Sequence, residues 1–345
     1  MPLVAFFVAD QLWGGLAGLL ISFAASLAIN AIAWLKEGKF DYREIASDFV
    51  LVLAFGVADI IVDHVAPNAA ALATSFVLTA ILALTAMLGA RRVMGRMLEK
   101  VRPGVTKNPY LISLMNGCVI RMTIWSGCAS MLYLCAFLDN SSAASLWIEK
   151  YALLVVLFSY LATEIIFARV RKSKYKSVEW VPLMSPDGTV IGSAPRPLVH
   201  NGSKWLHPVV HLHVVSSSGK LLLQLRPKTK KIQPGKWDTA VGGHIALGEQ
   251  LTDALRRETL EEIGLASFEA RLIRKYIWQC DVESEYVFVF QTQSDGPFNP
   301  KNVGEVDELR FWSAKELTDA IGTGVLTQNI EKELNEGLIQ DLQIR

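Results

Sequence analysis

Long uncharged stretches dominate the first half of the chain. Four of them are residues 11–35, 66–90, 112–138 and 151–168. The first has no charged side chain, the third is interrupted only by Arg121, and the fourth only by Glu164. Because a helix rises 1.5 Å per residue, about 20 apolar residues cross the hydrocarbon core of a bilayer. The pattern therefore predicts at least four transmembrane helices.

A fifth stretch, residues 45–62, contains Asp48 and Asp59, so its apolar character alone does not decide whether it crosses a membrane. The charges of the loops decide whether this stretch crosses the membrane. Lys and Arg gather in segments 36–44, 91–107 and 169–176, whereas segment 63–68 has none and segment 139–150 has only Lys150. Cytoplasmic loops carry the excess of Lys and Arg, and five spans put all three basic segments on one side. We therefore predict an all-α bundle of about five spans, with the N-terminus outside and the C-terminal half in the cytoplasm.

Charged residues inside or beside these spans have two interpretations. Asp59 and Asp63 lie four residues apart, with His64 next to them. They could bind an ion or a proton, since carboxylates within a membrane are costly, or they could lie at the outer interface. The interface is the favoured reading. Arg121 is expected to extend toward the cytoplasmic surface, and Glu164 to do the same or to pair with Arg169.

The second half changes to short strand and helix patterns separated by Asp187-Gly188, Ser218-Gly219 and similar turns. Alternating or continuous apolar runs predict strands at residues 178–184, 189–191, 209–215, 221–225, 270–279 and 286–292. Helical spacing predicts helices at residues 250–263, 314–321 and 328–336. Mixed strands with few helices indicate an α/β or α+β domain.

Composition separates the same two halves. Residues 1–168 hold 22 charged side chains, and residues 169–345 hold 45. The second half therefore reaches the roughly 25% typical of soluble domains, and the first falls to about half of that. The overall net charge of +1 suggests no nucleic-acid partner. The four cysteines form neither a disulfide framework nor a CxxC metal pair.

Acidic residues cluster at helical spacing after a pair of glycines. Glu258, Glu261 and Glu262 share one helix face, and Arg257 lies four residues before Glu261. Three neighbouring carboxylates repel one another unless a cation neutralises them, and oxygen ligands suit Mg²⁺. An exposed acidic helix would show the same pairs without binding metal. The wider spacing separates these alternatives.

The full spacing, G-x5-E-x7-R-E-U-x-E-E-x-G-U from Gly243 to Leu265, resembles the Nudix box. Thr259 is the one departure, at a position where an aliphatic residue is usual. The resemblance implies a mixed sheet sandwiched by helices, and Mg²⁺-dependent hydrolysis of a diphosphate. It makes Glu258 and Glu262 metal ligands, and Glu261 a ligand or base. The domains expected are residues 1–168 in the membrane, 169–177 as a basic linker and 178–345 as the Nudix domain.

A second resemblance, to the isopentenyl-diphosphate isomerase branch of that superfamily, covers Arg196 to Glu285. It implies a metal site of His200, His207, His244, Glu283 and Glu285, with Glu262 as a further acidic ligand. It also implies that Arg226 and Lys230 grip the diphosphate, and it places Arg196 where that branch has a lysine. Mg²⁺ is the expected cofactor, with Mn²⁺ as an alternative and a second divalent metal at the His/Glu site. His211 and His213 match no ligand position and are expected to be structural or to line the substrate site.

The departures from the isomerases favour hydrolysis. The isomerase branch has a catalytic cysteine directly before the Gly-His pair, and this chain has Gly242 there. Isomerisation needs a proton donor and an acceptor, and glycine is neither. No Trp follows Trp312, so the aromatic residue of the branch's C-terminal segment is missing as well.

The leading hypothesis is a membrane-anchored Mg²⁺-dependent Nudix hydrolase with Arg257, Glu261 and Glu262 as its catalytic residues. Its substrate would be a nucleoside diphosphate derivative or an isoprenoid or lipid-linked diphosphate. One alternative is isomerase activity without the cysteine. Another is a membrane channel or sensor whose Nudix module only binds a ligand. The sequence leaves the oligomeric state open.

Overall fold

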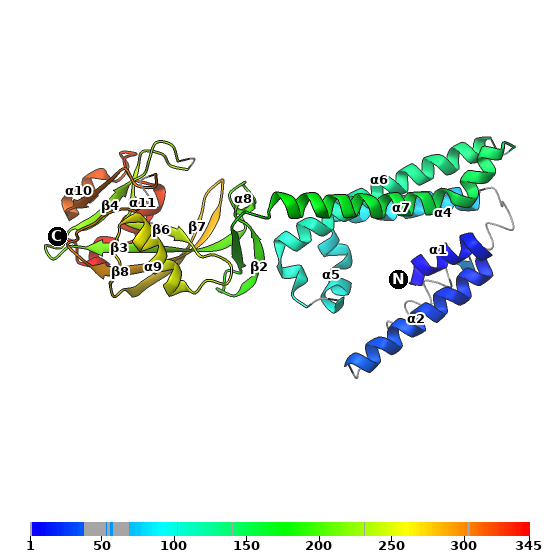
Figure 1. Ribbon diagram of the computed structural model, residues 1–345, viewed down its shortest axis with the longest axis horizontal. Coiled ribbons are helices and arrows are strands. Elements are labelled where there is room, and N and C mark those ends of the chain that lie inside the picture. Colours follow the sequence, from blue (N-terminus) through cyan, green and yellow to red (C-terminus); the bar gives the residue numbers. More distant parts are fainter. Residues whose placement is uncertain are drawn as a thin grey trace. The chain divides into compact units, whose positions relative to one another are not determined.

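The computed structural model describes residues 2–37, 53, 56–57, 69–101, 103–139, 141–230, 232–301 and 304–345. The described residues divide into two compact units. One comprises residues 1–101 and 112–171, and the other comprises residues 102–111 and 172–345. The first unit is helical and the second contains all the described strands (Figure 1). The two units are considered separately below.

Helices account for nearly all of the described N-terminal residues. They are α1 (Pro2–Trp13), α2 (Gly15–Glu37), α4 (Ala70–Leu88), α5 (Ala90–Val101), α6 (Pro109–Leu138) and α7 (Ala143–Lys174). Four of these, α2, α4, α6 and α7, are long and apolar enough to cross a membrane. The predicted fifth span at residues 45–62, with Asp59 and the adjoining Asp63 and His64, lies almost entirely outside the described residues.

Arg121 and Glu164 pair with each other across α6 and α7. The guanidinium donates two hydrogen bonds to the carboxylate, at 2.7 and 2.8 Å, and the thiol of Cys118 donates a third at 3.3 Å. The prediction of Arg169 as the partner of Glu164 was therefore wrong, because Glu164 pairs with Arg121. The extension of Arg121 toward the cytoplasmic surface stays a prediction. Mutual pairing satisfies both charges inside the helix pair, which is the usual solution for ionisable groups between apolar helices.

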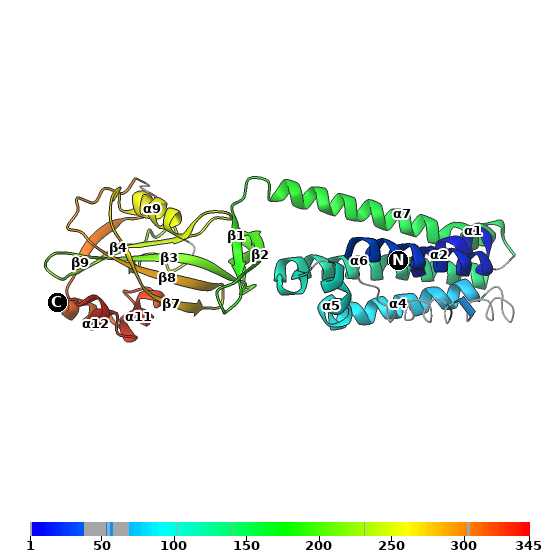
Figure 2. The ribbon, with the colours of Figure 1, turned by 90° about the horizontal axis from the view of Figure 1, so that it is seen from below.

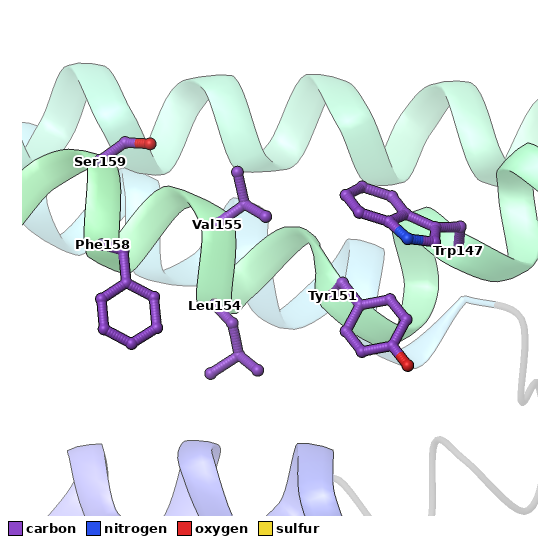
Figure 3. A pocket seen from close by; sticks show the side chains of 6 residues that line it. All are labelled: Trp147, Tyr151, Leu154, Val155, Phe158 and Ser159. Atoms are coloured by element: carbon purple, nitrogen blue, oxygen red, sulfur yellow. The ribbon is translucent and has the colours of Figure 1, made fainter.

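Small hydroxyl side chains connect α4 to α6. The hydroxyl of Thr79 lies 2.7 Å from that of Ser126 and 3.1 Å from that of Ser130. Hydrogen bonds between helices contribute to helix association where the hydrophobic effect does not drive it. By contrast, a hollow along α7 is lined by mostly apolar side chains: Trp147, Tyr151, Leu154, Val155, Phe158 and Ser159 (Figure 3). Phe158 is 65% exposed there.

The C-terminal unit contains two sheets. The smaller is the antiparallel pair β1 (Trp180–Met184) and β2 (Val190–Pro195). Tyr110, at the start of α6, packs edge-on against Trp180 and Trp205 of this unit. The larger sheet comprises β3 (Leu206–Val215), β4 (Leu221–Leu225), β5 (Trp237–Thr239), β6 (Val241–His244), β7 (Arg271–Gln279), β8 (Ser284–Gln293) and β9 (Glu308–Trp312).

Strand β3 is the centre of the larger sheet. It runs parallel to β8 along its whole length, and its other edge pairs antiparallel with β6 and then with β4. Strands β5 and β9 pair with β4, and β7 pairs with β8, all antiparallel. The sheet is therefore mixed. Nine of the ten β3 residues are buried, as expected for a strand paired on both edges and covered on both faces.

Helices cover both faces of this sheet (Figure 2). Helix α9 (Leu251–Glu262) buries Ala254 and Leu255 against Val210 and Leu212 of β3. The opposite side is covered by α10 (Ala314–Ala320), α11 (Gln328–Asn335) and α12 (Leu338–Leu342), which pack on Leu221 and Leu223. The one-turn helix α8 (Arg196–Val199) follows β2. This is the C-terminal α/β architecture with a mixed sheet that the sequence predicted.

The longer elements agree with the predicted ranges to within a few residues. The helix predicted at 250–263 is α9, at Leu251–Glu262, and the strand predicted at 270–279 is β7, at Arg271–Gln279. The sequence pattern missed β5, β6 and β9, which are only three to five residues long. All three contain charged residues or glycines, so they lack the apolar run that marks β1 and β4, which are no longer than β9.

Leu223 is fully buried at the centre of the cluster beneath α10–α12. We expect Leu223→Ala to lower the free energy of unfolding by about 2–5 kcal/mol, because it removes a packed side chain and leaves a cavity. Denaturant unfolding of the detergent-solubilised chain measures the change. Val190→Ala is the control, since Val190 is 60% exposed. Equal effects of the two substitutions would contradict the packing described here.

Candidate active site and metal centre

Helix α9 carries the three clustered glutamates, but it buries them unequally. Glu258 and Glu262 are both less than 10% exposed, whereas the side chain of Glu261 is 42% exposed. The buried side of the helix meets β6, where Glu262 contacts Gly242 and Glu258 lies against Gly243. The helix thus places two carboxylates inside the domain and one at its edge.

Glu262 is held by neutral donors. The backbone N–H of Gly242 donates to its carboxylate at 2.9 Å, and the Nε2 of Gln224 does so at 3.0 Å. Burial nevertheless raises the pKa of Glu262 to about 8. Burial likewise raises the pKa of Glu258 to about 7, although the guanidinium of Arg257 lies beside it. A cation close to both carboxylates would remove this penalty on their charged forms.

Arg257 organises the acidic cluster. Its guanidinium donates to Glu249 at 2.8 and 3.0 Å, and to Glu258 at 2.7 Å. It also donates to the carbonyl oxygen of His244 at 3.0 Å and lies 3.6 Å from Glu261. The bond to Glu249 is the main reason that the pKa of Arg257 is raised. One planar side chain therefore fixes two carboxylates and the end of β6 together.

Gly243 is required by close packing. A Cβ atom at this position would overlap the carboxyl group of Glu258. Only glycine lets β6 pass this close to the buried acid. The contact with Glu258 therefore explains why the motif has a glycine at position 243.

Three histidines from different segments meet at the C-terminal end of β6. His200 follows α8, His207 lies on β3 and His244 ends β6. Their potential ligand atoms all lie within 4.8 Å of one another. The Nε2 atoms of His200 and His244 are 3.0 Å apart, and the rings of His207 and His244 stack with 5.3 Å between centroids. This is a grouping that could hold one metal ion.

The chemistry of the three rings fits a metal. The Nδ1 of His207 donates to the carbonyl oxygen of Trp205 at 3.0 Å, which leaves its Nε2 as an acceptor. That Nε2 is buried and has no hydrogen-bond partner among the described residues. Burial lowers the pKa of His207 to about 4 and holds the pKa of His244 well below its usual range. Neutral imidazoles with a free lone pair are what a divalent cation binds.

Two further acids adjoin these histidines. Glu283 accepts a hydrogen bond from the Nδ1 of His200. Glu285 pairs in register with His207, and the side-chain amide of Asn329 on α11 lies 3.4 Å from its carboxylate. Burial, and then the charge of Glu283, raise the pKa of Glu285 to about 8. The predicted residues of the His/Glu site are thus close in space, although they are spread over more than 80 positions of the sequence.

The three predicted diphosphate-binding residues are placed differently. Arg196 is about half exposed and pairs with Glu179 at 2.9 Å, yet its charge also contributes to the low pKa of His244. Arg226 donates to Asp238 and to the carbonyl oxygen of Ile232, both at 3.0 Å. Lys230 lies in the loop between β4 and β5. No described contact joins Arg226 or Lys230 to the histidines or to the α9 glutamates.

A buried cluster that the sequence analysis missed lies around Glu333 of α11. Its carboxylate accepts hydrogen bonds from the Nδ1 of His211 at 3.0 Å, from the Nε2 of His213, and from the hydroxyl of Tyr276 at 2.6 Å. Burial opposes ionisation of Glu333, but the two imidazoles hold its pKa well below the usual range. The alternating histidines on β3 were the only signal in the sequence, because a lone glutamate in an amphipathic helix does not indicate its partners.

Comparison with known proteins finds similar sequences and similar folds. The model of the NUDIX domain matches residues 205–329. The chain is 34% identical over 130 residues to an isopentenyl-diphosphate Delta-isomerase of Mycolicibacterium vanbaalenii, covering 36% of this chain and 72% of that one. It is 29% identical over 149 residues to the uncharacterized Nudix hydrolase YfcD of Salmonella typhi, covering 43% and 80%. A crystal structure of DR0079 from Deinococcus radiodurans aligns with 46% of this chain and 98% of that one, at 22% identity and a TM-score of 0.39.

We expect Gly243→Ala to displace the carboxyl group of Glu258 without unfolding the domain, because the end of that side chain can move. The affinity for Mg²⁺ or Mn²⁺ should fall about 10- to 100-fold, as when other supports of a metal site are lost. Titration calorimetry measures it, and thermal unfolding checks the fold. Gly304→Ala is the matched control, since no atom lies near its added Cβ. Unchanged metal affinity in Gly243→Ala would show that Glu258 needs no such close approach.

Proposed function

Because this chain belongs to the Nudix family and is a Nudix-type hydrolase, we propose that it cleaves a diphosphate-containing substrate with the help of bound divalent cations. The observation that carries the proposal is the arrangement of Glu258 and Glu262. Both carboxylates are buried side by side on α9, with raised pKa values, and the one guanidinium that contacts this cluster among the described residues is already shared with Glu249. Such a cluster is short of positive charge, which a divalent cation supplies.

We propose that Glu258, Glu261 and Glu262 hold Mg²⁺, or Mn²⁺ in its place. A second divalent cation would be held by the three histidines together with Glu283 and Glu285. The orphaned Nε2 of His207 supports the second site. A cation bound there or at α9 would neutralise charge on phosphoryl oxygens and acidify a water molecule.

The side chains would divide the remaining work according to their exposure. Glu261 is the acid at the edge of the domain, and its exposure supports a role in accepting a proton from an attacking water. Arg257 would act by positioning, since its donors are engaged by Glu249, Glu258 and the backbone of His244. Of the three predicted phosphate-binding cations, Arg196 is the one whose charge lowers the pKa of His244. Arg226 and Lys230 would contribute if substrate reaches their loop.

We further propose that residues 1–168 anchor the enzyme as a multi-pass membrane domain, followed by a basic linker at 169–177 and the catalytic domain at 178–345. The four long apolar helices support the anchoring. The distribution of Lys and Arg between the loops supports an outside N-terminus and a cytoplasmic catalytic domain. The substrate would be a nucleoside diphosphate derivative or a lipid-linked diphosphate within reach of the membrane.

Isomerase activity is a second candidate, favoured by the histidine cluster and by the similarity to named isomerases. Gly242 counts against it, because it provides no side chain for proton transfer. Incubation with isopentenyl diphosphate in deuterated water tests this alternative, and we expect no deuterium to enter the recovered substrate.

We expect Glu262→Gln to lower kcat for diphosphate hydrolysis by at least about 100-fold, since it removes a charged ligand from the centre of the cluster. Removal of divalent metal with a chelator should abolish activity, and added Mg²⁺ or Mn²⁺ should restore it. Chromatographic detection of the phosphate and monophosphate products formed from a panel of diphosphates measures both effects. Glu308→Gln, at an exposed position on β9, is the control. The proposal fails if the wild type hydrolyses none of the panel, or if Glu262→Gln matches it.

A further inference from the structure

The first residues of α6 belong to the C-terminal unit, which includes residues 102–111. The remainder of the helix belongs to the N-terminal unit and is one of the four long apolar helices. Three side chains of segment 102–111, those of Val105, Asn108 and Tyr110, are at most 9% exposed. A membrane anchor needs no buried contacts of this kind with the domain that it holds. Segment 102–111 therefore calls for a role beyond anchoring.

Asn108 fixes the start of α6 to the C-terminal unit. Its Oδ1 accepts hydrogen bonds from the backbone N–H of Tyr110 at 3.0 Å and of Leu111 at 3.2 Å. These N–H groups have no partner within the first turn of a helix, so the side chain caps α6. The amide of Asn108 also lies directly against Gly192 of β2, where a Cβ atom would overlap it. Capping and close packing together fix the position of Tyr110.

Tyr110 packs against two tryptophans of the C-terminal unit. Its ring centroid lies 5.7 Å from that of Trp180 and 6.0 Å from that of Trp205, with interplanar angles of 80° and 63°. Edge-to-face contacts of this kind are favourable for aromatic rings and depend on their orientation. A displacement of Tyr110 would therefore be felt by both tryptophans.

The backbone carbonyls of the two tryptophans are bonded to segments that carry metal-centre histidines. The carbonyl oxygen of Trp205 accepts a hydrogen bond from the Nδ1 of His207 at 3.0 Å. The carbonyl oxygen of Trp180 accepts one from the backbone N–H of Leu247 at 2.8 Å, three residues after His244. The tryptophans thus connect Tyr110 to the surroundings of two candidate metal ligands.

The larger sheet does not hold Trp205 in place. The pairing of β3 with β8 begins one residue later, at Leu206. The residue before Trp205, Lys204, has a φ of 54°, a left-handed conformation that a residue with a side chain keeps only where its surroundings impose it. The N–H of Trp205 donates to the hydroxyl of Ser203 at a long 3.5 Å. The ring contact with Tyr110 therefore supplies a constraint on Trp205 that the strand ladder does not.

The carbonyl of Trp205 decides which nitrogen of His207 is open to a metal. While the Nδ1 donates to that carbonyl, the proton of the neutral ring stays on Nδ1 and the Nε2 keeps its lone pair. This Nε2 is the buried atom without a hydrogen-bond partner among the described residues. If the carbonyl moved away, the ring could carry its proton on Nε2 instead and would no longer offer a lone pair there.

We propose that Tyr110 is a positioning residue for the histidine metal centre. By holding Trp205, it keeps the carbonyl of that residue against the Nδ1 of His207 and so keeps the Nε2 open to a divalent cation. This inference rests on the proposed second metal site and extends its support to a residue outside the matched NUDIX domain at 205–329. Because Tyr110 lies in the first turn of α6, the metal affinity of the histidines depends on how a long apolar helix begins.

The test measures Co²⁺ binding to the full-length, detergent-solubilised protein, and His207→Ala identifies the binding that involves the histidine site. We expect Tyr110→Ala to weaken this binding about 10-fold, as when other outer supports of a metal ligand are lost. Tyr110→Phe, which keeps the ring, should retain most of the affinity. Leu223→Ala is the control for lost packing, since it opens a buried cluster that contains none of the three histidines and should leave Co²⁺ affinity unchanged.

A second measurement needs no metal. In protein labelled with ¹⁵N-histidine, NMR distinguishes a ring protonated on Nδ1 from one protonated on Nε2, and His207→Ala assigns the signals of His207. We expect wild type and Leu223→Ala to hold the Nδ1–H form, and Tyr110→Ala to populate both forms. Tyr110→Leu, which keeps apolar volume without the ring, replaces Tyr110→Ala if thermal unfolding shows that the alanine variant does not fold.

Unchanged Co²⁺ affinity in the folded Tyr110 variant, an equal loss in Leu223→Ala, or an unchanged tautomer of His207 would overturn the inference. Absence of His207-dependent Co²⁺ binding in the wild type would instead refute the proposed histidine metal site. In that case the tautomer decides whether Tyr110 positions the ring: the inference stands if the variant populates both forms, and falls if it keeps the Nδ1–H form. Neither measurement requires turnover, so both are independent of whether the proposed hydrolysis occurs.

Discussion

The C-terminal domain depends on the placement of negative charge where water is scarce. Glu258, Glu262 and Glu285 are all buried, and burial raises the pKa of each. The fold offsets this cost unevenly. Arg257, the backbone N–H of Gly242 and the amide of Gln224 stabilise the α9 acids, whereas two imidazoles stabilise Glu333 enough to lower its pKa. Glu258, Glu262 and Glu285 keep raised pKa values, and these are acids for which a divalent cation is proposed. Glu333 differs from them, because its protein partners already stabilise its charge.

Much of the fold follows from local patterns in the sequence. Long apolar runs and helical spacing suffice for α2, α4, α7 and α9, because each holds its signal within one continuous segment. The mixed sheet was predicted only in outline. Pairing of β3 with β8, some 75 residues later, depends on contacts that no local window contains. The pairing of Arg121 with Glu164 was missed for the same reason, since it joins two helices 43 positions apart.

In the candidate site, too, residues within one segment could be predicted, whereas contacts between distant segments could not. The α9 glutamates and Arg257 could be identified from spacing alone, since one helix carries all of them. The histidine set came from a family resemblance, because its members derive from α8, β3 and β6. Neither route indicated Glu333. Its role arises only when α11 folds back over the sheet and brings a C-terminal residue to His211 and His213, more than 110 positions earlier.

The hydrogen bond from Arg257 to the carbonyl oxygen of His244 links the acidic cluster on α9 to the histidine cluster at the end of β6. The same guanidinium donates a hydrogen bond to Glu258, so one side chain connects the acidic cluster to the end of β6, where His244 of the histidine cluster lies. A displacement of this guanidinium would therefore disturb groups at both places. Cations bound at the two proposed sites would then influence each other, and by linkage the influence would be reciprocal: whatever affinity the first gained from the second, the second would gain equally from the first.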